Sequence, residues 1–115
     1  MLEWSYRELV NTINESLNDY ENDGHYNYTT EQIADRCFYE YMTVSMQGYT
    51  EATIIYAEIA KFIIENCSKD FVSLYKNEIK EKFRDFNLEK LDMELTLAER
   101  NELEFKIKSI LENLY

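Results

Sequence analysis

One stretch of the chain, residues 50–66, is apolar on nearly every side of a helix and limits how the rest can fold. The polar residues between positions 52 and 64 are Thr53, Glu58 and Lys61. A helix that is apolar almost all round lies in a protein core or in a membrane, and this run is shorter than the about 20 apolar residues that span a bilayer. Its isoleucines would also suit a strand, but its length, alanines and interior charges favour a helix. We therefore predict the buried central helix of a soluble domain.

Two amphipathic patterns precede this central segment. Residues 6–22 carry a capping box at Ser5 and Glu8, and we expect this helix to stop before Gly24. Its apolar stripe is Tyr6, Leu9, Val10, Ile13, Leu17 and Tyr20. A second helix is expected from Thr30 to about residue 47, closed by Gly48. Its stripe is Ile33, Ala34, Cys37, Phe38, Tyr41, Val44 and Ser45.

The pattern continues after the central segment, whose own start we assign to a Thr50 cap with Glu51 in the first turn. Apolar spacing predicts a helix over 71–86, an ambiguous connector over 87–94 and a last helix opened by a Thr96 capping box. The chain has no proline, two glycines and no convincing strand alternation. We predict an all-α fold, a compact bundle of five or six short helices around a buried central helix, in a single domain spanning residues 1–115.

The formal net charge of −11 is unevenly distributed. Residues 1–60 hold 11 acids and two arginines, for a net charge of −9, whereas residues 61–115 hold 12 acids and 10 bases, for a net charge of −2. Because its net charge is so negative, we expect the protein to repel nucleic acid and anionic lipid and to bind a basic protein partner. Both a monomer and a dimer are compatible with the sequence.

The residue types that carry most enzyme chemistry are scarce. The two glycines do not suffice for a phosphate-binding loop, and His25, the single histidine, is expected to be a surface residue with no special role. Residues 18–24 faintly resemble a calcium loop, but Thr30 stands where the distal glutamate belongs. We expect no catalytic residue, cofactor or metal. With no basic and then apolar leader at the start, we expect a cytoplasmic protein with Cys37 and Cys67 as reduced thiols.

A surface built by the first two helices is the remaining candidate for function. Six of the ten tyrosines fall between residues 20 and 49, interleaved with acids. Tyrosine is enriched in interfaces, and acids speed encounter with a basic partner. The predicted partner-binding residues are Asp19, Glu21, Asp23, Tyr26, Tyr28, Glu31, Asp35, Tyr39 and Met42. The alternative is that the acids are a plain solvated face and that Tyr20 and Tyr41 belong to the rim of the core.

Three segments carry a resemblance to a known family. They are residues 4–9 (WSYREL), 28–34 (YTTEQIA) and 51–60 (EATIIYAEIA). In this order they resemble the Imm3-type immunity proteins of bacterial polymorphic toxin and contact-dependent inhibition systems. Thr53 stands where that family has proline, and Tyr56 where it has tryptophan. The resemblance covers roughly residues 4–83, and residues 87–115 have no counterpart in it.

The resemblance implies a protein that binds and neutralises the C-terminal toxin domain of a cognate effector, often a nuclease with a basic cleft. The acidic, tyrosine-rich surface would then occupy that cleft, and the immunity protein itself would perform no chemistry. A rival interpretation suits the size and charge equally, namely a phage-encoded acidic inhibitor that mimics DNA and blocks a restriction or CRISPR nuclease.

Overall fold

The computed structural model describes residues 5–22, 28–40, 48–84, 86–92 and 94–114, without the side chains of 38–40 and 88. Five α-helices and one short 3-10 helix make up this part of the chain, and it contains no strand. The elements are α1 (Tyr6–Glu21), α2 (Thr30–Glu40), α3 (Tyr49–Asn66), α4 (Lys69–Arg84), η2 (Leu88–Lys90) and α5 (Leu97–Glu112). The prediction of an all-α bundle of five or six short helices is therefore confirmed.

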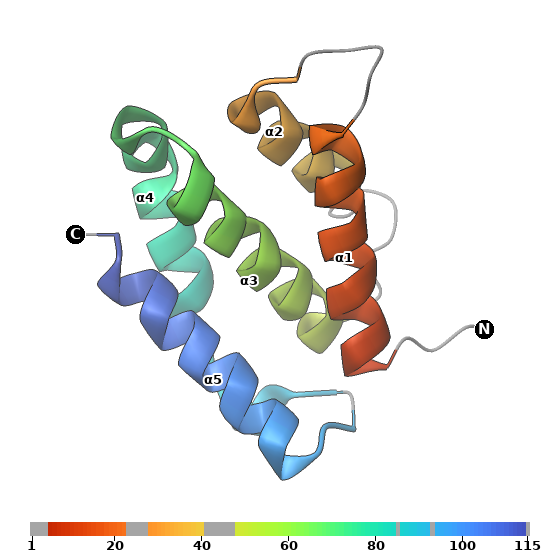
Figure 1. Cartoon of the computed structure of the whole chain (residues 1–115). Helices are drawn as coiled ribbons and strands as arrows, with labels where there is room; N and C mark the ends of the chain where they lie inside the picture. Colours follow the sequence, from red (N-terminus) through yellow and green to blue (C-terminus); the bar gives the residue numbers. More distant parts are fainter. Residues whose placement is uncertain (1–4, 23–27, 41–47, 85, 93, 115) are drawn as a thin grey trace.

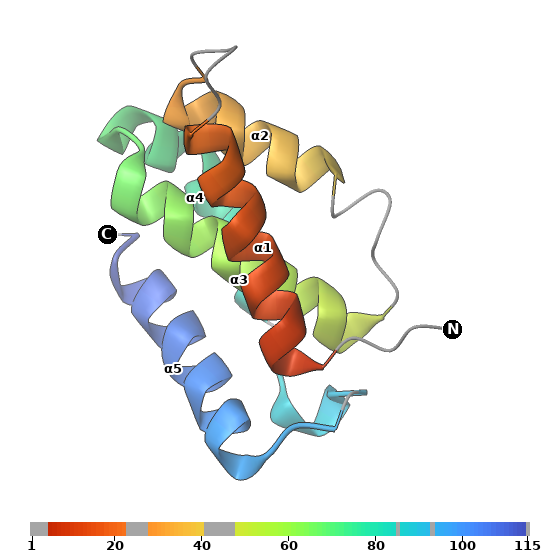
Figure 2. The same ribbon diagram turned by 45° about the vertical axis from the view of Figure 1, so that its right-hand side comes forward.

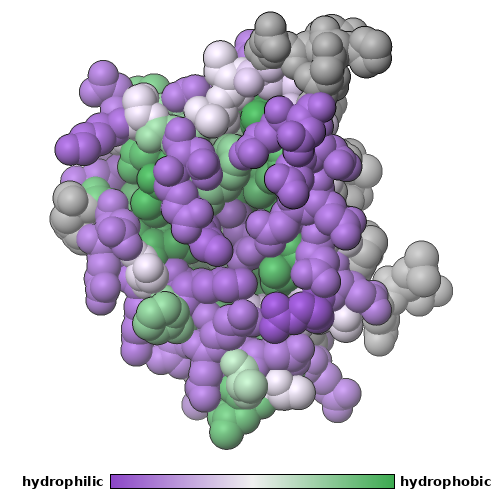
Figure 3. All heavy atoms as spheres, in the orientation of Figure 1, coloured by the Kyte–Doolittle hydropathy of each residue, from purple (hydrophilic) through white to green (hydrophobic). Residues whose placement is uncertain are grey.

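Helix α3 runs through the middle of the molecule and contacts all four other α-helices (Figure 1). The helices α1 and α2 pack on each other and on one side of α3, and α4 and α5 pack on each other on the other side. The turned view shows α1 crossing in front of α3 with α4 behind it (Figure 2). The face seen in Figure 3 is mostly hydrophilic, with hydrophobic atoms visible in the hollows between the helices.

The burial of α3 is as complete as its composition predicts. Every residue over 50–60 is buried, and Ile55 and Ile59 have no exposed surface. The stripe of α1 also faces the core, since Tyr6, Leu9, Val10, Ile13 and Leu17 are buried and Tyr20 is half-buried against them. The second stripe is buried at Ile33, Ala34 and Cys37.

Two capping boxes form in full. At α5 the Thr96 hydroxyl accepts from the Glu99 amide at 3.1 Å, and the Glu99 carboxylate accepts from the Thr96 amide at 2.9 Å. At α2, Thr29 and Gln32 make the same reciprocal pair at 3.1 and 2.9 Å. At α1 the Ser5 hydroxyl accepts from the Glu8 amide at 3.2 Å. Short polar signals next to apolar stripes therefore predicted these helix starts correctly.

The prediction that Thr50 caps the start of α3 is wrong. Gly48, not Thr50, is the N-cap, and it makes no side-chain cap. The cap comes from the connector before α5, where the Asp92 carboxylate accepts from the Tyr49 amide at 3.2 Å and from the Thr50 amide at 3.0 Å. Thr50 itself is fully buried, and its hydroxyl accepts from the Asp92 amide at 2.7 Å. A carboxylate suits the positive end of a helix dipole better than a hydroxyl does.

The remaining boundaries differ by small amounts. The described part of α2 ends at Glu40, so the expected continuation over 41–47 and the turn at Gly24 lie outside the described residues. Helix α4 begins at Lys69, where the Ser68 hydroxyl accepts from the Phe71 amide at 3.2 Å. The ambiguous connector contains η2, and its Leu91 and Leu95 pack half-buried against the core. It is thus both a short helix and an apolar lining.

Candidate functional site

The predicted partner-binding residues divide into those that the structure describes and those that it does not. Asp23, Tyr26 and Met42 lie outside the described residues, and Tyr39 lies in α2 with a side chain that is not described. The described members are Asp19, Glu21, Tyr28, Glu31 and Asp35. These five lie at two places, the end of α1 and the side of α2 that faces α4.

An acidic ridge runs along the outer side of α1. We define it as Glu8, Glu15 and Asp19, all exposed. At 3.6 residues per turn these three lie within about 40° of one another and about 150° from the buried stripe. Asp19 was predicted from the sequence and the other two were not, although their spacing of seven and four residues opposite the apolar stripe is the signal of a common helix face.

The acidic ridge has few positive charges beside it. Arg7, the one base of α1, forms an ion pair with Glu102 of α5 at 3.2 Å. None of the three ridge carboxylates forms an ion pair with another residue that the structure describes. Within the described part of the chain, the ridge is therefore a face of unneutralised negative charge.

Tyr28 lies at the rim of the core. Its ring meets the Tyr20 ring edge-on, with centroids 5.4 Å apart, and the Arg36 guanidinium lies 5.3 Å from the Tyr28 ring centroid. Tyr28 is half-buried. Aromatic rings packed edge-to-face are rigid contact surfaces that lose little entropy on binding.

Glu31 and Asp35 face the turn between α3 and α4. The Asp35 carboxylate accepts from the Tyr75 hydroxyl at 2.6 Å, and this hydrogen bond, with burial, raises the pKa of Tyr75 to about 12. Glu31 accepts from the Ser68 amide at 3.5 Å, and hydrogen bonds from its own amide and from Thr30 hold its pKa below the ordinary value. These two acids therefore already have internal partners, unlike the acidic ridge.

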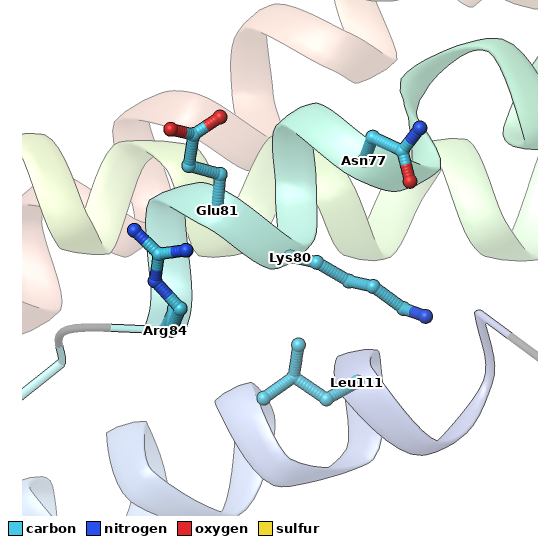
Figure 4. Close-up of a pocket in the computed structure, with 5 residues that line it drawn as sticks. All are labelled: Asn77, Lys80, Glu81, Arg84 and Leu111. Carbon is cyan, nitrogen blue, oxygen red and sulfur yellow. The ribbon is translucent and has the colours of Figure 1, made fainter.

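Two cavities border α5. One, of about 530 Å³, lies between α4 and α5 and is lined by Asn77, Lys80, Glu81, Arg84 and Leu111. Figure 4 shows Leu111 projecting from α5 toward α4, with the Lys80 side chain extended across the space between the two helices. The other, of about 420 Å³, lies between α3 and α5, where Phe105 is 72% exposed. Mixed charges and single apolar side chains are typical of solvated grooves between helices.

Metal and thiol chemistry find no support in the described part of the chain. No group of three or more histidine, cysteine or acidic side chains is placed there to hold a metal ion. Cys37 is a buried reduced cysteine and Cys67 a half-buried one. Burial raises the pKa of the Cys67 thiol, which disfavours the reactive thiolate. No helix in the same part of the chain is long and apolar enough to cross a membrane.

Comparison with known proteins supplies the identity. The family model described as Immunity protein Imm3 matches residues 2–115. The match includes α5 and the connector before it, so the expectation that residues 87–115 have no counterpart was wrong. No curated protein and no solved structure matches the chain. With nearly its whole length matched, the chain belongs to the Imm3 family of immunity proteins.

Proposed function

We propose that this immunity protein neutralises its cognate toxin by covering a basic surface of the toxin domain with an acidic face built on α1 and α2. Membership of an immunity-protein family implies a toxin partner. The observation that carries the proposal is the acidic ridge, with three exposed carboxylates and no ion pair to any described residue. Unneutralised charge on one face steers association with a surface of opposite sign.

The toxin class that fits this face best is a nuclease. Along the α1 axis, Glu15 and Asp19 are about 6 Å apart and Glu8 and Glu15 about 10 Å apart, at 1.5 Å per residue. A row of carboxylates along one helix face is similar to a nucleic-acid strand in being a regular line of negative charges. A ridge with this spacing would occupy phosphate-binding positions in a basic cleft and exclude the nucleic acid.

The aromatic part of the proposed face would set the dissociation rate. Tyr28 meets the Tyr20 ring edge-to-face and lies beside the Arg36 guanidinium, so it offers a rigid aromatic surface to a partner. The other members expected from the sequence belong to the same proposal, namely Glu21, Asp23, Tyr26, Glu31, Asp35, Tyr39 and Met42. Inhibition by occupancy requires no catalysis from the immunity protein, and the family assignment favours this function over that of a phage inhibitor.

Co-expression tests the function directly. The protein is produced with the toxin domain encoded beside its gene, and copurification and growth are measured. We expect a stable complex and rescued growth. A toxin that still kills in the presence of a folded, soluble partner would refute the neutralising function.

Charge reversal on the acidic ridge tests the face. Glu15→Lys combined with Asp19→Lys should slow association with the toxin domain by about tenfold or more, because charges at an interface act mainly on the association rate. The matched control is Glu89→Lys with Glu112→Lys, which changes the net charge equally at exposed positions away from α1. Association rates are measured by stopped flow. Equal slowing by both pairs would show a net-charge effect and no specific role for the ridge.

A further inference from the structure

One charged residue lies inside the most apolar helix of the molecule. Glu58 of α3 is 3% exposed, and both of its carboxylate oxygens have partners. Asn14 of α1 donates to one oxygen at 2.8 Å, and the Lys106 ammonium of α5 lies 2.9 Å from the other. Three helices thus meet at a single buried carboxylate.

The same cluster joins α1 directly to α5. The Lys106 ammonium donates to the Tyr6 hydroxyl at 3.4 Å and lies 5.6 Å from the centroid of the Tyr6 ring. One turn away, Arg7 and Glu102 form their ion pair. Burial, and then the neighbouring Glu102 and Glu58 carboxylates, raise the pKa of Tyr6, so this hydroxyl stays protonated. The contacts that Glu58 makes with Asn14 and Lys106 join different helices and therefore depend on how those helices are placed relative to one another.

Stability alone does not explain such a cluster. When two charges are removed from water, the free energy of hydration that they lose is barely offset by their attraction. Apolar replacements of similar volume often give a protein of equal stability. An apolar stripe, however, tolerates small rotations and repacking, and loses uniqueness before it loses stability. A directional network of hydrogen bonds does not tolerate such rotations, because each shift leaves a buried polar group without a partner.

We propose that Asn14, Glu58 and Lys106 form a registry lock that fixes the rotation of α1 against α3 and α5, and so positions the acidic ridge. The proposal rests on the proposed function, because the ridge is the face assigned to the toxin. Asn14 lies between Glu8 and Glu15 in α1, so a rotation that breaks its bond to Glu58 also turns the ridge. The three residues are positioning residues and need not touch the toxin.

The test separates stability from position. Lys106→Met leaves Glu58 buried without its cation and should lower the unfolding temperature. Glu58→Leu with Lys106→Met removes both charges and should restore that temperature to within about 5 °C of the parent. Asn14 keeps a partner in this pair variant, because its amide also donates to the Val10 carbonyl at 2.8 Å. Lys106→Arg retains the charge and the donors, and should behave as the parent.

Two readouts are taken on each variant. The first needs no toxin: spin labels at exposed Asn11 and Asn101 report the distance distribution between α1 and α5, which should broaden in the pair variant and stay narrow in Lys106→Arg. The second is toxin affinity, which should weaken about tenfold in the pair variant through the lost preorganisation. The matched control, Glu104→Gln with Lys108→Met, removes an exposed i,i+4 pair of 3.1 Å on the same helix and should change neither.

Each result decides something. An unchanged distance distribution in a folded pair variant would overturn the registry lock. A broadened distribution with unchanged toxin affinity would keep the lock but refute the ridge as the toxin-binding face. Should the pair variant not fold, Lys106→Met and Lys106→Arg still give the comparison, since a broadened distribution in the first and a narrow one in the second supports the lock, and equal widths overturn it.

Discussion

At the scale of single residues, the start of α3 holds two carboxylates with opposite effects. Asp92 lies on the helix amides, and hydrogen bonds from Thr50 and then Tyr49 lower its pKa. Glu51 is 7% exposed, and burial and then Asp92 raise its pKa. One oxygen of Glu51 has no hydrogen-bond partner among the described residues. The first carboxylate is therefore stabilised as an anion, and the second is destabilised as one.

Glu51→Gln should stabilise the fold at neutral pH by about 1 kcal/mol, because it removes a buried charge that lacks a partner. The folded-state pKa of Glu51 lies above its ordinary value of 4.5. The ionised carboxylate therefore costs stability at pH above that folded-state pKa, and the cost disappears as the pH falls toward 4.5. Urea unfolding at a series of pH values measures the difference. A gain that is the same at pH 4 and pH 7 would contradict this assignment.

Asp92→Ala should destabilise the fold by about 1 kcal/mol, the usual cost of a lost helix cap. Because the pKa of Asp92 is lowered, its contribution is present above the ordinary value of 3.8 and is lost as the pH falls through the folded-state pKa. The two proteins should thus become equally stable at low pH.

Gly48→Ala should also destabilise the fold by displacing this cap, since an added Cβ would lie 2.6 Å from one Asp92 carboxylate oxygen. The double variant should lose less than the sum of the single losses, because both changes remove one cap. Additive losses would contradict a shared cap.

At the scale of elements, the apolar patterns determined most of what could be predicted. The stripe of α1 and the composition of α3 depend on local spacing, so the sequence alone was sufficient. The Asp92 cap and the Glu58 pair could not be predicted, because their partners are 42 to 48 residues away and nothing local marks them. Asp19 was found among the acids, whereas Glu8 and Glu15 required attention to the outer face of α1.

Ile59→Ala should cost about 2–5 kcal/mol of folding stability, as other buried truncations do, and Ile55→Ala a similar amount. Both isoleucines have no exposed surface in the middle of α3. Leu74→Ala on α4 is the control, since Leu74 is 79% exposed and should cost almost nothing. Chemical unfolding gives the free energies. Toxin affinity should fall only to the extent that the variants unfold, so a weakened complex with a fully folded Ile59→Ala would place α3 nearer the partner.

At the scale of the whole molecule, the net charge of −11 and the acidic ridge lead to a kinetic expectation. Association with the toxin domain should slow by about tenfold or more from low to high salt, because screening shortens the reach of the charges to about 3 Å at 1 M. The dissociation rate should change much less, since the close contacts proposed between Tyr28 and the toxin are screened little by salt. An association rate that does not depend on salt would contradict electrostatic steering.

The Asp92 cap has a consequence for how the chain is made. Asp92 is 42 residues beyond Thr50, so at about 5–20 residues per second the ribosome adds it about 2–8 s after the start of α3. During that interval the first amides of the most apolar helix lack the Asp92 cap. A nascent chain interrupted before residue 92 exposes that helix, and is a natural substrate for chaperones and proteases. Only a chain that extends to residue 92 can form the Asp92 cap of α3.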